Sequence, residues 1–162
     1  MARNAGAGRG FGAFRIRCLA MTAGRSLPFA LLGLDHVVLR VRDMAGLERF
    51  YCEVVGCAVE RRRPELGLLH LRAGRTMIDL VDAGGPLGRE GGGPPDHAGP
   101  NVDHVCLRVE PFEAEAIAAH LRRHGVEPSE VGIRFGADGE GPSLYLHDPE
   151  GNRIELKGSP VA

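Results

Sequence analysis

Two histidines stand at matching positions in the two halves of this 162-residue chain. His36 lies in LDHVVLRV (residues 34–41), and His104 lies in VDHVCLRV (residues 102–109). Six of the eight letters are identical, and the histidines are 104 − 36 = 68 residues apart. Such a repeat indicates that one structural unit occurs twice in the chain.

Each histidine has a carboxylate further along its half: Asp79 in TMIDLVD and Glu155 in NRIELKG. Because side chains alternate along a strand, both carboxylates face away from their aliphatic neighbours. If two units pack face to face, two imidazoles and two carboxylates converge into a set that suits a divalent metal with an open position. The alternative is four ordinary polar residues on solvent-facing strands. The recurrence of the pair in both halves favours the metal site.

The elements that position these residues follow the same order in each half. In the first half, a strand begins at His36, Asp43 is a candidate helix N-cap, and Gly56 is a candidate helix stop. Turn residues then separate three strand-like runs, over residues 58–62, 68–72 and 76–81.

The second half predicts a strand over residues 102–109 and a helix that begins at Pro111 and is ended by Gly125. Further strand-like runs lie near residues 131–135, 143–147 and 153–156. The intervening residues 83–101 are too rich in Gly and Pro for regular structure. We therefore predict an α+β fold with two tandem βαβββ modules in one domain, residues 34–157, divided into module one (34–82), a linker (83–101) and module two (102–157), with a tail (158–162).

Charge is unevenly distributed along the chain. Residues 1–33 carry five arginines and no acid, whereas the remainder holds 15 basic and 21 acidic residues, a net charge of −6. The acidic body argues against nucleic acid as the main partner. We interpret residues 1–33 as a disordered extension, or as the result of an early start codon, with an organelle transit peptide as the alternative.

The four cysteines form no C-x-x-C pair, which is typical of a reduced, intracellular protein. No apolar run approaches the length of a membrane span. We expect a cytoplasmic protein that binds a small molecule and neither nucleic acid nor membrane.

Other polar residues are weaker candidates. Arg40 and Arg108 follow their histidines by four residues on the same strand face, where they could hold an anionic substrate group or pair with local acids. His120 and His124 share one helix face beside basic residues, which indicates a solvated surface. His70 could line a cavity, although solvent is favoured.

The chain resembles the vicinal oxygen chelate superfamily, which includes glyoxalase I, extradiol dioxygenases, fosfomycin-resistance enzymes and bleomycin-binding proteins. The resemblance spans residues 33–157 and is carried by DHVVLRV, LERFYCEVVG, TMIDL, VDHVCLRV and SLYLHDPEGNRIEL. It implies paired βαβββ modules whose mixed sheets curve around a central metal cavity. It also implies four metal ligands, at His36, Asp79, His104 and Glu155. Asp79 is one methylene shorter than the glutamate common in glyoxalase-like members.

The resemblance implies a lyase or isomerase in which a divalent metal (Ni, Co, Mn, Zn or Fe) polarises substrate oxygens. Glu155, with Asp79 as its counterpart, would move the substrate proton. Arg40 matches a position that helps hold glutathione, but Ala83 and Pro100 depart from the other glutathione-contacting positions. A thiol co-substrate is therefore an open expectation.

Other members of the superfamily supply the alternatives. GEGPSLYLHDPEGNRIE fits a fosfomycin-transferase pattern in which Ser143 and Tyr145 would bind substrate, although Phe135 stands where that pattern has lysine. A dioxygenase would use His36, His104 and Glu155 with Fe(II). A non-catalytic, bleomycin-type binding protein would lack the ligands. Two-module members often dimerise, in some cases by exchanging modules between chains, which the Gly/Pro-rich linker would permit, so we expect a homodimer.

Overall fold

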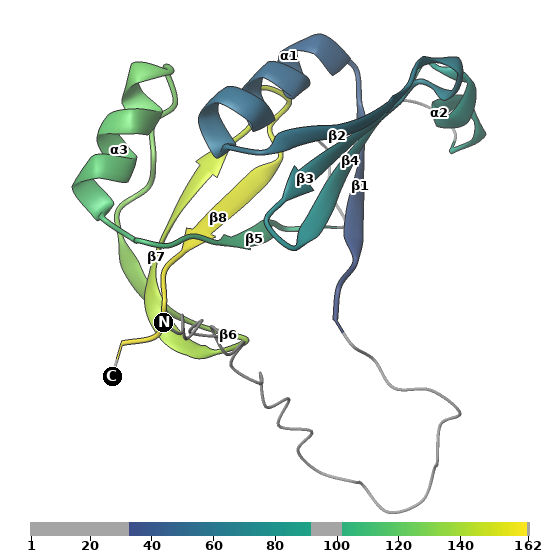
Figure 1. Ribbon diagram of the computed structural model, residues 1–162. Helices are drawn as coiled ribbons and strands as arrows, with labels where there is room; N and C mark the ends of the chain where they lie inside the picture. The colour runs from purple at the N-terminus through teal and green to yellow at the C-terminus, as the bar shows by residue number, and fades with distance from the viewer. Residues whose placement is uncertain (1–32, 92–101, 162) are drawn as a thin grey trace, which may run out of the picture. The chain divides into compact units, whose positions relative to one another are not determined.

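The computed structural model describes residues 33–91 and 102–161 (Figure 1). The first part of the chain contains β1 (His36–Val41), α1 (Met44–Arg49), the π-helix η1 (Phe50–Val55), β2 (Ala58–Arg63), the 3-10 helix η2 (Pro64–Leu66), β3 (Leu68–Ala73), β4 (Thr76–Asp82) and α2 (Pro86–Glu90). The second part contains β5 (Val105–Arg108), α3 (Ala114–Arg123), β6 (Gly132–Gly136), β7 (Gly139–His147) and β8 (Arg153–Lys157).

Two four-stranded mixed sheets organise these elements, in the orders β1-β4-β3-β2 and β5-β8-β7-β6. In each sheet the opening strand pairs in parallel with the last strand of its module, and the other pairings are antiparallel. The identical orders confirm the predicted α+β fold with two βαβββ modules. The four candidate ligands therefore come from adjacent strands, or from the residue just before one.

The first helix begins and ends where its sequence signals predict. The Asp43 side chain accepts a hydrogen bond from the Gly46 backbone N–H at 2.9 Å, which satisfies one of the free donors of the first turn. Gly56 follows η1 with φ of 88°, a left-handed conformation that favours glycine. These two residues fix the length of the helical segment that packs behind the first sheet.

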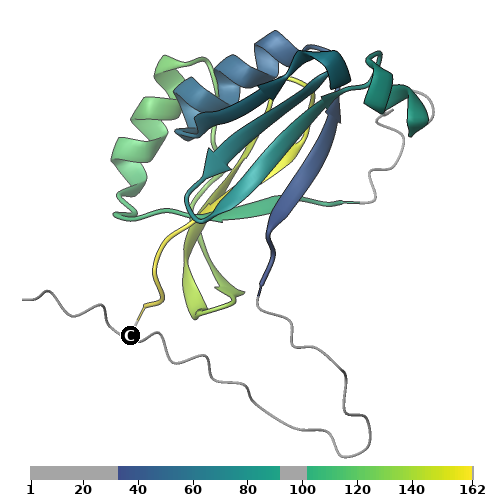
Figure 2. The same ribbon diagram turned by 45° about the vertical axis from the view of Figure 1, so that its right-hand side comes forward.

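One hydrophobic core is shared by both modules. It contains Ile78 and Leu80 of β4, Ile154 and Leu156 of β8, and Leu121 of α3. Figures 1 and 2 show α1 with η1 lying beside α3, and the His120 imidazole is 2.9 Å from the Val54 carbonyl oxygen. Because side chains alternate along strands, the sheet faces opposite this core carry the predicted carboxylates.

The turn between β7 and β8 joins the two modules. Asp148 accepts hydrogen bonds from the Tyr51 hydroxyl of η1 at 3.0 Å and from the Asn152 side-chain amide at 2.7 Å. Glu150 accepts from the backbone N–H groups of Arg42 and Asp43, at 2.7 and 2.6 Å. The DPEGN motif therefore acts as a polar clamp onto the start of α1 and onto η1.

Several predicted boundaries were wrong. The helix of module two begins at Ala114, and Pro111 lies in the loop that precedes it. The predicted stop is confirmed, because the helix ends at Arg123 and Gly125 follows with φ of 74°, a left-handed conformation that favours glycine. The strand predicted over residues 102–109 is limited to β5, so His104 precedes it.

The linker prediction was also wrong in part, since α2 forms within residues 83–101. Pro86 occupies its first turn, where a missing N–H costs nothing. The interpretation of residues 1–33 concerns a segment that, apart from Gly33, lies outside the described residues. No helix in the described ranges is long and apolar enough to cross a membrane.

Candidate metal and substrate site

The last strand of each module, β4 or β8, carries a carboxylate at its central residue. In the first sheet, Asp79 pairs in register with Val38 of β1 and His70 of β3. In the second sheet, Glu155 pairs with Cys106 of β5 and Tyr145 of β7. Two corresponding groups result: half-site one contains His36, His70 and Asp79, and half-site two contains His104, Tyr145 and Glu155.

The opening histidine of each half-site is oriented by the aspartate that precedes it. His36 Nδ1 lies 2.7 Å from Asp35 Oδ1, and His104 Nδ1 lies 2.7 Å from Asp103 Oδ1. Since a carboxylate only accepts, each Nδ1 donates this hydrogen bond, and Nε2 is the ring nitrogen that remains for a further partner. This carboxylate–imidazole arrangement is the one that commonly orients metal-ligating histidines.

These hydrogen bonds also shift pKa values. The bond to Asp35 raises the pKa of His36, against the lowering effect of burial, and the negative charge of Asp79 adds to the rise. The bond from His104 lowers the pKa of Asp103. The register of β1 and β4 places Asp79 opposite Val38, so His36 lies two residues along the neighbouring strand.

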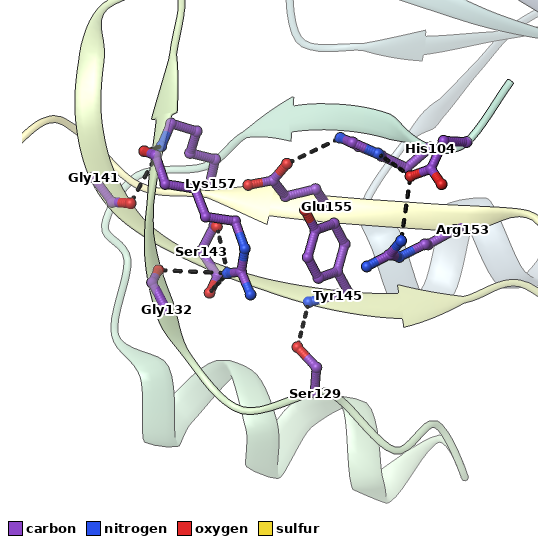
Figure 3. Close-up of polar contacts among 11 residues, drawn as sticks. His104, Ser129, Gly132, Gly141, Ser143, Tyr145, Arg153, Glu155 and Lys157 are labelled. Carbon is purple, nitrogen blue, oxygen red and sulfur yellow. Dashed lines mark hydrogen bonds and ion pairs between the residues drawn. The ribbon is translucent and has the colours of Figure 1, made fainter.

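A second imidazole–carboxylate contact exists in each half-site. His104 Nε2 lies 3.2 Å from Glu155 Oε2, as Figure 3 shows, and His70 Nδ1 lies 2.9 Å from Asp79 Oδ2. The other oxygen of each carboxylate, Glu155 Oε1 and Asp79 Oδ1, is buried and has no hydrogen-bond partner. A buried, unpaired carboxylate oxygen is costly, and a bound cation would satisfy it. The donor set therefore fits a divalent metal.

The four predicted ligands lie in two separate half-sites, and His104–Glu155 is the pair in direct contact among the described residues. Within residues 33–91 and 102–161, no group of three His, Cys, Asp or Glu side chains is arranged to hold a metal ion. Both half-sites lie on sheet faces opposite the shared core. The central metal cavity stays a prediction that needs the two half-sites to be brought together.

The predicted substrate-binding residues have different surroundings. The Tyr145 ring in half-site two has the guanidinium groups of Arg153 and Arg134 at 3.8 and 4.5 Å from its centroid and the His104 ring at 5.4 Å. Ser143 is fully buried, and its Oγ already accepts from Arg134 at 2.9 Å. Tyr145 is therefore the better placed of the two to meet a substrate.

The two arginines that follow the histidines are held by local groups. Arg40 donates to the Gly88 carbonyl of α2 at 2.9 Å, and Arg108 pairs with Asp138 at 2.8 Å. The local pairing that the sequence left open is thus observed for Arg108. Arg40 is directed at a backbone carbonyl of the segment that follows β4.

Sequence reasoning named His70 only as a weak candidate and did not consider Lys157. The preference for solvent at His70 was wrong, because its side chain is only 22% exposed and lies against Asp79. Lys157 is buried on the Glu155 face of β8, and its ammonium donates to the carbonyls of Gly141, at 3.2 Å, and Arg134. Strand alternation could have found Lys157, whereas the position of His70 depends on the register between β3 and β4.

Comparison with known proteins identifies the family. The model of the Glyoxalase/Bleomycin resistance protein/Dioxygenase superfamily matches residues 33–156. The chain belongs to this superfamily. Virulence protein STM3117 of Salmonella typhimurium is 27% identical over 145 residues, covering 88% of this chain and 95% of that protein. Biphenyl-2,3-diol 1,2-dioxygenase 3 of Rhodococcus globerulus is 28% identical over 128 residues, covering 76% of this chain and 62% of the dioxygenase.

Solved structures share the fold. The crystal structure of STM3117 superposes with a TM-score of 0.63 at 25% identity, covering 81% of this chain and 99% of that chain. Lactoylglutathione lyase from Agrobacterium tumefaciens superposes with a TM-score of 0.56 at 21% identity, covering 79% and 94%. At that identity the likeness to the lyase concerns the fold alone.

Proposed function

We propose that this superfamily member is a metal-dependent, glyoxalase-like enzyme, a lyase or isomerase that acts on a small oxygenated metabolite. The proposal rests on one observation above all. Each module holds a buried carboxylate beside an imidazole, His70 beside Asp79 and His104 beside Glu155, and each carboxylate has a buried oxygen without a hydrogen-bond partner. In a binding protein without a metal, both buried oxygens would remain unsatisfied and would destabilise the fold.

The proposed ligands are His36, Asp79, His104 and Glu155. In a single chain these ligands lie in two half-sites, on the sheet faces opposite the shared core. We therefore propose that half-site one of one chain meets half-site two of a second chain in a homodimer. Two composite sites would then form per dimer. The preceding aspartates, Asp35 and Asp103, would keep each imidazole in the orientation that ligation requires.

A divalent metal in this site would polarise the substrate oxygens and stabilise the negative charge that develops on them. Glu155 would accept and return the substrate proton, because its unpaired Oε1 is available and burial shields it from water. Tyr145 would donate a hydrogen bond to a substrate oxygen, and Arg153 beside its ring would attract negative charge. Asp79 would hold the metal from the opposite module.

A second candidate is an extradiol-type dioxygenase. Similarity to the Rhodococcus dioxygenase favours it, and His36, His104 and Glu155 would make a two-histidine, one-carboxylate set that suits Fe(II). Oxygen uptake with a catechol and Fe(II) distinguishes this reaction from a lyase or isomerase, which consumes no oxygen.

The experiment is a turnover assay on metal-stripped protein reloaded separately with Ni, Co, Mn, Zn and Fe(II). The substrate is the adduct of methylglyoxal with glutathione or with a smaller thiol. We expect turnover with at least one metal and a loss of about 100-fold or more in Glu155→Gln, which keeps the shape of the side chain but cannot accept the proton. No turnover with any metal would refute the glyoxalase-type reaction.

A further inference from the structure

The first half-site contains an imidazole that the four-ligand set does not use. His70 lies at the centre of β3, directly opposite Asp79 of β4, and its Nδ1 is 2.9 Å from Asp79 Oδ2. Despite this distance, His70 Nδ1 is buried without a hydrogen bond, and so is Asp79 Oδ1. Two unsatisfied polar atoms from neighbouring side chains are expensive and call for a common partner.

The spacing matches two ligands of one metal ion. Metal–nitrogen distances of about 2.0–2.1 Å and metal–oxygen distances of about 2.0–2.2 Å place adjacent ligand atoms about 2.8–3.0 Å apart at a right angle, and about 3.3–3.5 Å apart at a tetrahedral angle. His70 Nδ1 lies 2.9 Å from Asp79 Oδ2, and in half-site two His104 Nε2, from a different strand position, lies 3.2 Å from Glu155 Oε2. Both pairs therefore have the spacing of adjacent ligands.

The two half-sites differ at the position that His70 occupies. Register places His70 opposite Asp79 in the first sheet and Tyr145 opposite Glu155 in the second. Tyr145 is flanked by two guanidinium groups, whereas His70 has the Asp79 carboxylate as its neighbour. The Asp79 side chain is one methylene shorter than that of Glu155 and extends less far from its strand. An imidazole beside Asp79 provides a second donor atom that can contact the same metal ion.

We propose that His70 is a metal ligand, coordinating through Nδ1 beside Asp79. This inference rests on the proposed function and extends its metal site. Half-site one then contributes two imidazoles, and the complete set is richer in nitrogen than two histidines and two carboxylates. Nitrogen ligands favour Zn, Ni, Co and Cu over Mg, Ca and Mn.

The test measures metal binding by the full chain, with Zn(II) and Co(II) as probes. Metal-stripped wild type is compared with His70→Ala, with His70→Gln, which retains a polar side chain, and with Asp79→Asn. The control is His124→Ala, which removes an exposed histidine at the end of α3. Zn(II) affinity is measured by competition with a chromophoric chelator, and the visible spectrum of bound Co(II) reports the ligands themselves. Circular dichroism confirms that each variant is folded.

We expect both His70 variants to lose about 100-fold or more in Zn(II) affinity, beyond the 10–100-fold typical of a residue that only orients a ligand. Their Co(II) bands should shift, and His124→Ala should match the wild type. An unchanged Co(II) spectrum in the His70 variants would overturn the inference, even with a smaller loss of affinity. If His104→Ala abolishes binding in that case, the proposed function stands. No metal binding by the wild type would overturn both.

Discussion

The hydrogen bond between Tyr51 and Asp148 is predicted to stabilise the contact between the two modules. Tyr51 is 1% exposed, and its hydroxyl donates to Asp148, which is 5% exposed. Burial, reinforced by the negative charge of Asp148, holds the pKa of Tyr51 far above its usual range, so the phenol stays a donor at all ordinary pH values. Tyr51→Phe removes this donor and little else.

The magnitude follows from the state of the acceptor. Asp148 keeps three donors in Tyr51→Phe, namely the backbone N–H of Glu150 and the backbone N–H and side-chain amide of Asn152. The carboxylate is therefore not left unpaired. A hydrogen bond to a charged group contributes about 1.5–3 kcal/mol, so we expect that loss in the free energy of unfolding. For a domain of this size it corresponds to a fall of about 5–12 °C in Tm.

Urea and thermal unfolding, followed by circular dichroism, measure this effect. Tyr145→Phe is the matched control, because Tyr145 is the other tyrosine of the chain and lies half-buried on the site face. We expect it to change stability by less than about 0.5 kcal/mol. Equal effects of the two substitutions, or a loss below about 0.5 kcal/mol in Tyr51→Phe, would refute the view of the DPEGN turn as a clamp.

Two further predictions concern titration and the orientation of the ligands. Burial, with a smaller effect of Cys52, raises the pKa of Cys57 to about 11, so the unfolded chain releases this proton first as pH rises. The contribution of the protonated Cys57 thiol to the free energy of unfolding is therefore complete below about pH 9 and declines towards pH 11. Iodoacetamide should label Cys57 slowly at pH 8 in the folded protein and rapidly in urea. Equal labelling rates would contradict the burial of Cys57. Asp103→Asn removes the charge that orients His104 and should weaken Zn(II) binding by about 10–100-fold; an unchanged dissociation constant would show that the contact does not support ligation.

The repeated pattern of the sequence was enough to predict the fold. Alternation in LDHVVLRV and TMIDLVD reflects sheets with one face in a core, and Asp43 and Gly56 are local signals whose effect depends little on the rest of the chain. Pro111 misled the prediction because a proline that suits a first helical turn also suits a loop. The short helix α2 gave no periodic signal, since it spans only Pro86–Glu90.

The candidate site was only partly predictable. The repeat identified the histidines and carboxylates, because matching positions in two modules carry information that a single residue does not. His70 could not be assigned, since its proximity to Asp79 is set by the antiparallel register of β3 and β4. Sequence periodicity likewise cannot tell whether two modules meet through their site faces or, as observed, through a shared core.

The central claim is that two chains together complete each metal site, and a mixed dimer tests it most directly. One chain carries H36A and D79A and the other carries H104A and E155A, with different affinity tags so that the heterodimer can be purified. Neither variant alone should bind Zn(II) in stoichiometric amounts. In the heterodimer, intact half-site one of one chain meets intact half-site two of the other, so we predict one Zn(II) per heterodimer, against two per wild-type dimer. A heterodimer without metal, or a wild type that binds its metal as a monomer, would contradict the account.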